Sequence, residues 1–325
     1  MHSERPLQLH DFGPERARLR EEVLAGLQKP QKELPCKLLY DERGSRLFGQ
    51  ICELEEYYPT RTEIAIMRVY SPEMMSLLGP GCLLIEYGSG GSIKTRILLD
   101  ELPDPAGYVP IDISRGELAR SAAALAADYP SLEVLPVCAD YTEPIDLPTP
   151  SRPAARRVAY FPGSTIGNFD PEPATHFLRT VAAECGPAGG LLIGVDLRKD
   201  PLVLHHAYND QSGISAQFNL NVLARINREL NGDFRLEQFQ HYAFYNPVPS
   251  RVEMHLVSLA DQQAMVGDVA IQFRRGESIW TESSYKYSPE EFESLAAEAG
   301  WSVEKIWTDP QQLFSVQYLT VRSPR

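Results

Sequence analysis

The stretch CLLIEYGSGGS, residues 82–92, is an apolar segment that leads directly into a glycine-rich turn. A short apolar run such as 82–87 is typical of a strand that is buried on both faces, and helical spacing follows at 94–101. Glycines in the intervening turn let the backbone bend sharply and approach a ligand closely. The stretch therefore predicts a strand, a ligand-binding turn and a helix in succession.

The same alternation of strand and helix continues on both sides of this stretch. Further strands are expected at 108–112, 132–137, 157–161 and 191–195. Helices are expected at 14–29, 45–55, 62–78, 94–101, 115–128 and 171–185. The last of them has Asp170 as its N-cap and Gly186 past its end. Alternating elements predict an α/β protein with a parallel sheet covered by helices on both faces.

The alternation stops near residue 200. Residues 201–231 have the spacing of a helix, and the segments 251–259 and 269–275 predict an antiparallel hairpin. A helix at 289–299, capped by Ser288, and strands at 301–307 and 314–322 follow. We therefore expect a Rossmann-like domain formed by 62–197 plus 287–325. A second, α+β domain would be formed by 1–61 plus 198–286.

Composition excludes several classes of protein. The 325 residues are 43% hydrophobic, which suffices for a buried core, and the net charge of −13 argues against a nucleic-acid partner. No apolar run is long enough to span a membrane, and no signal peptide is apparent. The five cysteines are scattered, and the adjacent His205 and His206 do not converge on one ion. We expect a cytoplasmic monomer with no metal.

Acidic residues follow the first three predicted strands. Glu86 is the next-to-last residue of the first, Asp112 ends the second, and Asp140 with Tyr141 follows the third. The carboxyl ends of parallel strands share one edge of a sheet, where ligands bind. A carboxylate at Asp112 can accept hydrogen bonds from ribose hydroxyls, and one at Asp140 can accept from an adenine amino group beside the ring of Tyr141. The pattern predicts a nucleoside cofactor.

The glycine turn distinguishes between cofactors. A dinucleotide fingerprint would place Gly or Ala at position 93, where Ile93 stands. An NAD-dependent oxidoreductase is therefore the less favoured alternative. The turn instead resembles the first motif of Rossmann-like methyltransferases, which implies S-adenosylmethionine as cofactor and S-adenosylhomocysteine as product. The expected cofactor-binding residues are Glu86, Gly88, Ser89, Gly90, Lys94, Asp112, Asp140 and Tyr141.

Three further motifs extend this resemblance to a particular family. The segments LYDERGSRLF (39–48), EYYPTRTE (56–63) and YFPGSTIGN (160–168) are similar to motifs of the histidine-specific Nα-methyltransferases of ergothioneine biosynthesis. The resemblance implies a class I methyltransferase core, whose sheet would end in the hairpin expected near the C-terminus. It also implies trimethylation of the α-amino group of L-histidine to hercynine. A fungal relative methylates a tryptophan derivative, so another aromatic amino acid, or a non-catalytic amino-acid sensor, remains an alternative.

The resemblance implies a binding pair for the imidazole ring. Glu282 and Ser284 match the residues that hold the ring, and Met254 matches a residue that packs against it. Side chains two residues apart in an extended segment point to one face. Neutral imidazole has one N–H donor and one acceptor nitrogen, which a carboxylate and a hydroxyl can satisfy. Taken singly, Glu282 would pass for a solvated residue.

The resemblance also implies contacts for the rest of the substrate. Asn168 and Tyr208 match residues that bind the carboxylate, although Asn168 alone could be a helix cap. Tyr57 and Tyr40 match tyrosines near the reacting amine and are the expected catalytic residues. The expected substrate-binding set is Tyr57, Gly163, Thr165, Asn168, Tyr208, Met254, Glu282 and Ser284.

Overall fold

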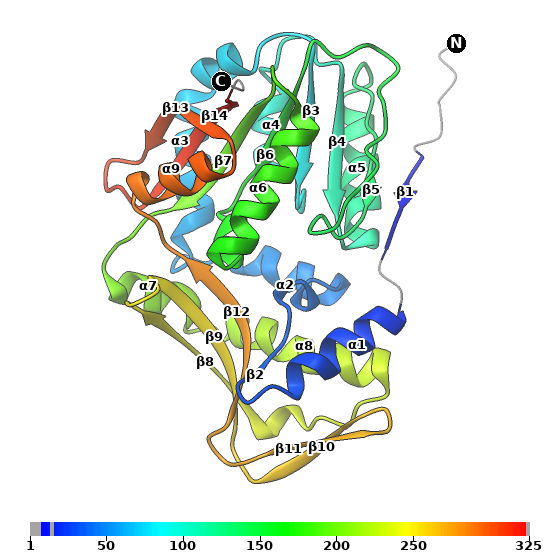
Figure 1. Ribbon diagram of the computed structural model, residues 1–325, viewed down its shortest axis with the longest axis vertical. Coiled ribbons are helices and arrows are strands. Elements are labelled where there is room, and N and C mark those ends of the chain that lie inside the picture. Colours follow the sequence, from blue (N-terminus) through cyan, green and yellow to red (C-terminus); the bar gives the residue numbers. More distant parts are fainter. Residues whose placement is uncertain (1–7, 14–15, 323–325) are drawn as a thin grey trace. The chain divides into compact units, whose positions relative to one another are not determined.

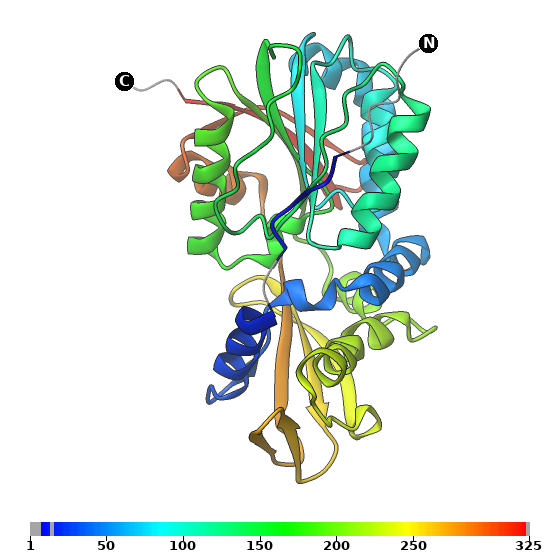
Figure 2. The ribbon, with the colours of Figure 1, turned by 90° about the vertical axis from the view of Figure 1, so that its right-hand side faces the viewer.

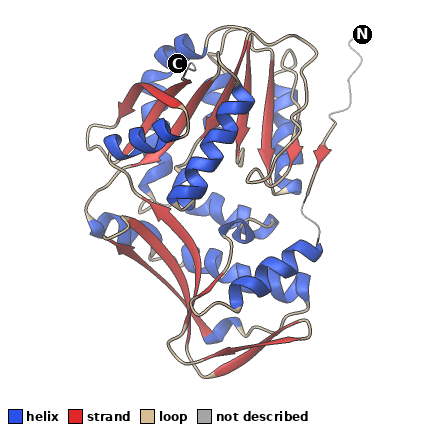
Figure 3. Cartoon of the chain, in the orientation of Figure 1, coloured by secondary structure: helices blue, strands red, loops and turns tan. Residues whose placement is uncertain are grey.

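A computed structural model describes residues 8–13 and 16–322 of the chain (Figure 1). These residues divide into two compact units. The first comprises 8–13, 59–198 and 287–322, and the second comprises 16–58 and 199–286. Each unit has its own sheet, whose strands are drawn in red in Figure 3.

The first unit is built on an eight-stranded sheet in the order β1-β5-β4-β3-β6-β7-β14-β13. Six strands are parallel: β1 (His10–Asp11), β5 (Val137–Cys138), β4 (Gly107–Asp112), β3 (Cys82–Tyr87), β6 (Arg156–Phe161) and β7 (Gly190–Asp196). The strands β14 (Phe314–Val321) and β13 (Trp301–Thr308) close the sheet as an antiparallel hairpin. The predicted Rossmann-like α/β class and the C-terminal hairpin are confirmed.

Helices cover both faces of this sheet (Figure 2). They are α3 (Tyr58–Leu78), α4 (Ile93–Leu99), α5 (Arg115–Asp128), α6 (Pro171–Cys185) and α9 (Pro289–Glu298). Apolar residues of α3, α4 and α5, including Met67, Leu98 and Leu125, share one buried cluster with β3, β4 and β6. The buried Trp301 donates its indole N–H to Leu178 O of α6 at 2.8 Å. The sheet is thereby buried on both sides, which explains the apolar runs in its strands.

One strand of the first unit is much shorter than expected. The segment 132–137 was predicted as a strand, but only Val137 and Cys138 form β5, with an isolated bridge from Val134 to Tyr108. Pro136 is the next-to-last residue of the segment and has no N–H to donate to a ladder. The expected strand is therefore interrupted, although its final residues still pair with β4.

The second unit is built on a four-stranded sheet in the order β2-β12-β9-β8. Its strands are β2 (Lys32–Glu33), β12 (Ser278–Tyr285), β9 (Arg251–Ser258) and β8 (Phe239–Asn246). A separate hairpin joins β10 (Gln262–Val266) to β11 (Val269–Phe273). The helices are α1 (Arg16–Leu27), α2 (Glu42–Glu53), α7 (Pro201–Tyr208) and α8 (Ile214–Leu230), with short 3-10 turns at Cys36–Leu39 and Leu236–Gln238. The prediction of an α+β architecture for this part of the chain agrees with these elements.

The strand pairing predicted here was wrong. The segment 251–259 does not form a hairpin with 269–275, because β9 pairs with β8 and β12 while β11 pairs with β10. Strand β8 was missed because its sequence, FQHYAFYN, has aromatic residues on both faces and lacks a simple alternation.

The single helix expected at 201–231 is two helices. Helix α7 ends at Tyr208, and α8 begins at Ile214 after its N-cap Gly213, which has a φ of 70°. In the connection, the Asp210 carboxylate accepts from Ile214 N and Ser215 N at 2.9 and 2.8 Å.

The units differ from the predicted domains near their ends. Residues 8–13 were placed in the domain 1–61, but β1 pairs with β5 and belongs to the first unit. The division falls between 58 and 59 and between 198 and 199. The predicted ranges also include 1–7, 14–15 and 323–325, which lie outside the described residues. Across 8–13 and 16–322, none of the helices has the length and apolar character to cross a bilayer.

The first turn of α9 provides a test of local stability. Ser288 Oγ accepts from Glu291 N at 3.2 Å, and Glu291 accepts from Ser288 N at 2.8 Å, forming a capping box. Ser288→Ala should lower the free energy of unfolding by about 1 kcal/mol, measured by urea denaturation with tryptophan fluorescence. Ser294→Ala in the same helix is the control and should change it by less than about 0.5 kcal/mol. Equal effects of the two substitutions would contradict this assignment.

Candidate active site

The glycine-rich turn between β3 and α4 is held against the end of β4. Gly88 and Gly90 have φ angles of 73° and 45°. Gly88 N and Ser89 N donate to Ile111 O at 2.8 and 3.1 Å, and Gly90 N donates to Asp112 Oδ2 at 3.1 Å. Positive φ values are easily adopted by glycine and cost energy for other residues. The turn therefore has a fixed shape in which backbone amides face the end of the sheet.

Asp112 lies where the ribose contact was predicted. Its Oδ1 accepts from Ser114 N at 2.8 Å, and its Oδ2 accepts from Gly90 N. Burial raises the pKa of this carboxyl group, although the two backbone donors oppose that effect. Each carboxylate oxygen has two lone pairs, so Asp112 can accept further bonds from a ligand's hydroxyl groups.

The hydroxyl groups around this turn fit a polar ligand. Ser89, Ser92 and Ser114 each have a buried Oγ that lacks a hydrogen-bond partner within residues 8–13 and 16–322. Buried hydroxyls are normally bonded, because an unpaired one costs free energy. A nucleoside-bearing cofactor with several hydroxyl and amino groups would supply the missing partners, so the residues present fit S-adenosylmethionine.

Glu86 has an internal role in the structure. Its side chain is 1% exposed, and its Oε2 accepts from Thr95 Oγ1 at 2.7 Å and from the Tyr108 hydroxyl. Burial raises the pKa of Glu86 to about 7. These bonds join β3 to α4 and β4 beneath the turn. The contact between Glu86 and the cofactor remains a prediction.

Glu63 is a site residue that the sequence analysis missed. It is completely buried, accepts from Gly163 N at 3.1 and 3.0 Å, and binds Lys94 Nζ at 2.7 Å. It thus joins the predicted cofactor residue Lys94 to the loop that follows β6. The last residue of the EYYPTRTE motif is Glu63 itself, but nothing local to that motif indicates its distant partners.

An aromatic cluster fixes Tyr141, the residue expected beside adenine. Its ring centroid lies 6.1 Å from that of Tyr87 and 5.8 Å from those of Phe161 and Phe177. Asp140 Oδ1 accepts from Thr142 N and Oγ1 at 3.0 and 2.6 Å, which orders the turn before Tyr141.

The loop after β6 carries three of the predicted substrate residues. Gly163 has a φ of 76° and is bound to Glu63, and Thr165 donates its hydroxyl proton to Pro162 O at 2.8 Å. Asn168 ends a 3-10 turn at Thr165–Asn168, while Asp170 is the N-cap of α6. The alternative that Asn168 caps the helix is therefore wrong, and its half-buried amide can donate to a ligand.

The predicted ring-binding residues share one face of the second unit's sheet. A bulge in β12 changes the register between Trp280, which pairs with His255, and Glu282, which pairs with Met254. His255 and Met254 are successive residues of β9 and point to opposite faces. Trp280 and Glu282 therefore also point to opposite faces although they are two residues apart. Glu282, Ser284 and Met254 lie together on the face opposite to Trp280.

Glu282 is buried without a complete set of partners. It is 8% exposed, and its Oε2 lacks a hydrogen-bond partner in the described parts of the chain. Burial raises its pKa to about 7, and the neighbouring Lys286 opposes this effect. Such a carboxylate is well suited to accept an N–H from a bound ring.

Tyr208 lies beside Glu282 and Ser284, the predicted ring-binding pair. Its hydroxyl donates to Ser284 Oγ at 2.8 Å and accepts from Lys286 Nζ at 3.1 Å. His241 Nε2 lies 2.9 Å from Tyr208 O, and its Nδ1 lies 2.9 Å from Asn219 Nδ2. Because Asn219 can only donate through that nitrogen, the His241 Nε2–H donates to Tyr208 O. Tyr208 is thus fixed from both its backbone and its hydroxyl.

Tyr57 and Tyr40 belong to an aromatic group in the second unit. Phe48 lies 5.5 Å from Tyr40 and 6.2 Å from Tyr57 between ring centroids, and Phe218 lies 5.4 Å from Tyr40. Tyr57 also packs edge-on against Tyr208 at 6.3 Å. Burial, then the neighbouring Tyr208, raises the pKa of Tyr57 well above its usual value. Phe48 and Phe218 were not predicted as site residues.

Two residues of the LYDERGSRLF motif have structural roles. Asp41 caps α2 by accepting from Gly44 N at 2.7 Å, and it binds Asn221 and Arg228 of α8 at 2.7 and 2.6 Å. A methyl group at Gly44 would lie 1.7 Å from Leu39 O. These contacts hold α2 against α8 and so position Tyr40 and Phe48.

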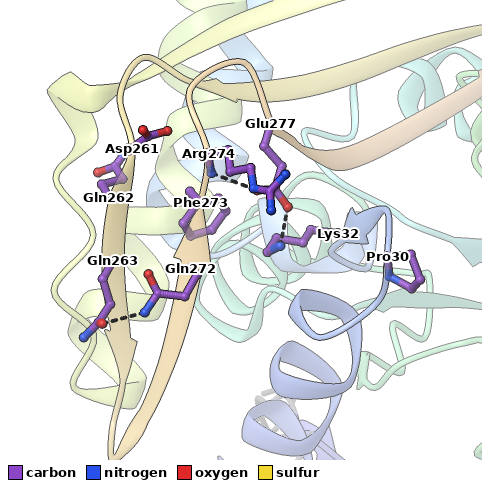
Figure 4. Close-up of a pocket in the computed structure, with 9 residues that line it drawn as sticks. All are labelled: Pro30, Lys32, Asp261, Gln262, Gln263, Gln272, Phe273, Arg274 and Glu277. Atoms are coloured by element: carbon purple, nitrogen blue, oxygen red, sulfur yellow. Dashed lines mark hydrogen bonds and ion pairs between the residues drawn. The ribbon is translucent and has the colours of Figure 1, made fainter.

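Other candidate features lie away from these residues. A surface hollow near β10 and β11 is lined by Pro30, Lys32, Asp261, Gln262, Gln263, Gln272, Phe273, Arg274 and Glu277 (Figure 4). None of the predicted site residues lines it. His205 and His206 are exposed on α7, and no group of three His, Cys, Asp or Glu side chains suited to a metal occurs among the described residues.

The predicted residues thus form one set in each unit. The first unit holds the cofactor set and the loop 163–168, and the second holds Tyr40, Tyr57, Tyr208, Met254, Glu282 and Ser284. The sheet order and the glycine turn at its carboxyl edge define a Rossmann-like methyltransferase. A model of the family described as histidine-specific, SAM-dependent methyltransferases matches residues 19–321. The chain belongs to this family, and its cofactor is S-adenosylmethionine.

Curated relatives match almost the whole chain. It is 43% identical over 310 residues to the histidine N-alpha-methyltransferase of Mycolicibacterium smegmatis, covering 94% of this chain and 95% of that protein. It is 43% identical over 297 residues to the enzyme of the same name from Mycobacterium tuberculosis, covering 90% and 91%. Ergothioneine biosynthesis protein 1 of Neurospora crassa is 36% identical over 296 residues, which cover 85% of this chain and 32% of that protein.

Gly88 allows a direct test of the cofactor turn. Gly88→Ala should weaken S-adenosylhomocysteine binding about tenfold or more, measured by calorimetry, because alanine disfavours the positive φ that shapes the turn. Gly186→Ala is the matched control, since Gly186 also has a φ of 73° but ends α6 away from the turn. The control should lose stability and keep its cofactor affinity. Equal affinity losses in both variants would refute the role of the turn.

Proposed function

We propose that this protein transfers three methyl groups in succession from S-adenosylmethionine to the α-amino group of L-histidine, giving hercynine in ergothioneine biosynthesis. The main support is the pair formed by Glu282 and Ser284 on one face of β12. An unpartnered carboxylate oxygen and a hydroxyl complement the N–H and the bare nitrogen of neutral imidazole. The names of the relatives from Mycolicibacterium smegmatis and Neurospora crassa agree with this substrate and pathway.

The remaining contacts are assigned by chemistry. The amide of Asn168 and the hydroxyl of Tyr208 suit the substrate carboxylate, because both can donate hydrogen bonds. In the structure the Tyr208 hydroxyl donates to Ser284, so Asn168 is the donor that is available to the carboxylate while this bond is kept. Met254 lies directly across from Glu282 and offers an apolar side chain to the ring.

The bound cofactor supplies an electrophilic methyl group on a sulfonium. The amine must present a neutral lone pair in line with that methyl group, and good positioning can save about 7–11 kcal/mol of the barrier. The high pKa of Tyr57 keeps its phenol protonated near neutral pH, so Tyr57 orients the amine rather than removing its proton. We assign the loss of the amine proton to solvent.

The aromatic group around the amine suits the product of each step. Tyr40, Phe48, Tyr57 and Phe218 present several rings within one cluster. A methylated ammonium is a large, weakly hydrated cation that is attracted to ring faces. These rings can therefore retain the amine as it gains methyl groups.

Mass spectrometry provides the direct test. The protein should convert L-histidine with S-adenosylmethionine to species that carry one, two and three added methyl groups, and it should leave tryptophan unchanged under the same conditions. Tryptophan should not react because indole has no acceptor nitrogen for Ser284. Methylation of tryptophan with histidine unchanged would instead support the alternative substrate. Binding of histidine without any methylation would support an amino-acid sensor.

The pKa of Glu282 predicts how histidine affinity depends on pH. Since burial raises this pKa to about 7, the carboxylate is ionised above pH 7 and gains a proton below it. Histidine affinity, measured by calorimetry in the presence of S-adenosylhomocysteine, should therefore fall as the pH is lowered from 8 toward 6.5. Glu282→Gln should bind histidine about tenfold more weakly at pH 8, as expected when a charged acceptor is replaced by a neutral one. It should also show a flatter dependence on pH over this interval.

The matched control is Glu253→Gln. Glu253 is buried to a similar degree, 6% against 8% exposed, but it lies on the opposite face of the same sheet and binds Arg251. This variant should keep the wild-type dependence on pH. An unchanged profile in Glu282→Gln would remove Glu282 from the ring site.

A further inference from the structure

Lys286 is a buried cation to which the proposed reaction assigns no role. It directly follows β12, and its side chain is 1% exposed. Its Nζ lies 2.7 Å from Ser284 Oγ and 3.1 Å from the Tyr208 hydroxyl. An ammonium group can only donate hydrogen bonds, so both hydroxyl oxygens accept from it.

The remaining bond of this group runs from Tyr208 to Ser284. The Tyr208 hydroxyl accepts from Lys286 and donates its own proton to Ser284 Oγ at 2.8 Å. Ser284 Oγ then accepts two bonds, one from Lys286 and one from Tyr208, and both of its lone pairs are in use. Its own proton must point elsewhere, and within the described ranges 8–13 and 16–322 Ser284 Oγ donates no hydrogen bond.

Glu282, on the same face of β12, is a hydrogen-bond acceptor, whereas Ser284 is a donor. Its Oε2 is a buried acceptor that lacks a donor in the described part of the chain. The site therefore offers one donor, the Ser284 hydroxyl, and one acceptor, the Glu282 carboxylate. Neutral imidazole offers the complementary acceptor and donor, whereas imidazolium offers two donors.

We propose that Lys286 is a positioning residue that fixes the direction of the Ser284 O–H bond, so that the site binds neutral imidazole with its N–H toward Glu282 and its bare nitrogen toward Ser284. This inference rests on the proposed function and adds a reason why the site binds the neutral imidazole ring in one orientation. Without the ammonium group, the Ser284 hydroxyl could donate to Tyr208 and accept from a ring N–H instead. Lys286 thus acts on the substrate through Ser284.

The effect of Lys286 on Glu282 is consistent with this role. The ammonium group lowers the pKa of Glu282 against the effect of burial, which favours an acceptor rather than a donor at that position. An ionised Glu282 accepts the ring N–H, and the discrimination against a ring protonated on both nitrogens comes from the Ser284 hydroxyl.

The first test compares two rings in two proteins. The ligands are L-histidine and pyrrole analogues of histidine, in which a C–H replaces the acceptor nitrogen, each titrated by calorimetry into protein saturated with S-adenosylhomocysteine. Wild type should bind histidine at least about tenfold more tightly than the analogue, which is about 1.4 kcal/mol. Lys286→Met should reduce this ratio to less than about threefold.

A second comparison asks whether Lys286 acts through Ser284. In a Ser284→Ala background, Lys286→Met should cause no further loss of discrimination, because the hydroxyl whose direction it sets is gone. Lys32→Met is the control, since Lys32 is a mostly buried lysine bonded to Glu277 at the other end of β12. It should keep the wild-type ratio. An undiminished tenfold ratio in Lys286→Met would overturn the proposal.

A measurement on the wild-type protein does not depend on the folding of any variant. Histidine labelled with 15N in the ring, bound at pH 7.5 with S-adenosylhomocysteine, should show one protonated and one bare ring nitrogen by NMR. Two protonated nitrogens, or signals averaged between tautomers, would refute the proposed polarity. Failure of wild type to bind histidine at all would refute the proposed function instead, so the two failures can be told apart.

Discussion

The bulge in β12 is the constraint on which the candidate substrate site depends. A regular strand would place Glu282 on the same face as Trp280, where Trp280 stacks on His255 with ring centroids 6.1 Å apart. The hydroxyl of the extra residue, Thr281, lies 2.6 Å from Asn219 Oδ1 and 3.0 Å from Met254 O, which share its single proton, and so holds the bulge in place. Bulges commonly redirect side chains beside functional sites. Here one inserted residue brings a carboxylate and a hydroxyl into a buried polar group with Tyr208 and Lys286.

The candidate sites of the two units are built from different kinds of polar group. In the first, backbone amides and carboxylates at the carboxyl edge of a parallel sheet form a rigid turn whose shape depends on positive φ angles. In the second, a small antiparallel sheet supplies directional hydrogen bonds from side chains, backed by α7 and α8. A rigid backbone cradle suits a cofactor that is common to many enzymes. A site built from side-chain donors and acceptors suits selection among amino acids, because a few substitutions can change which ring it accepts.

The first unit was largely predictable because its signals are local. The central strands β3, β4 and β7 are largely apolar runs, and most of the predicted cofactor residues lie at or just after the end of a strand, so topology brings them to one edge. The exception was 132–137, where Pro136 interrupts the ladder within an otherwise apolar segment. In the second unit, β8 carries aromatic residues on both faces, and strand partners depend on register rather than on pattern. Glu63, Phe218 and Lys286 were missed for a related reason: Lys286 meets Tyr208 across 78 residues of sequence, and nothing local to either residue indicates the other.

The pairing of β2 with β12 has a consequence for synthesis of the chain. Lys32 and Glu33 find their partners only at Ile279 and Trp280, so this sheet joins two segments that are synthesised far apart in time. Non-local pairings of this kind are slow to form, because the intervening loop must close first. A polypeptide that ends before residue 278 therefore lacks β12, the strand that carries Glu282 and Ser284. The candidate amino-acid site can form only after the strands β3 to β7 of the parallel sheet have been synthesised.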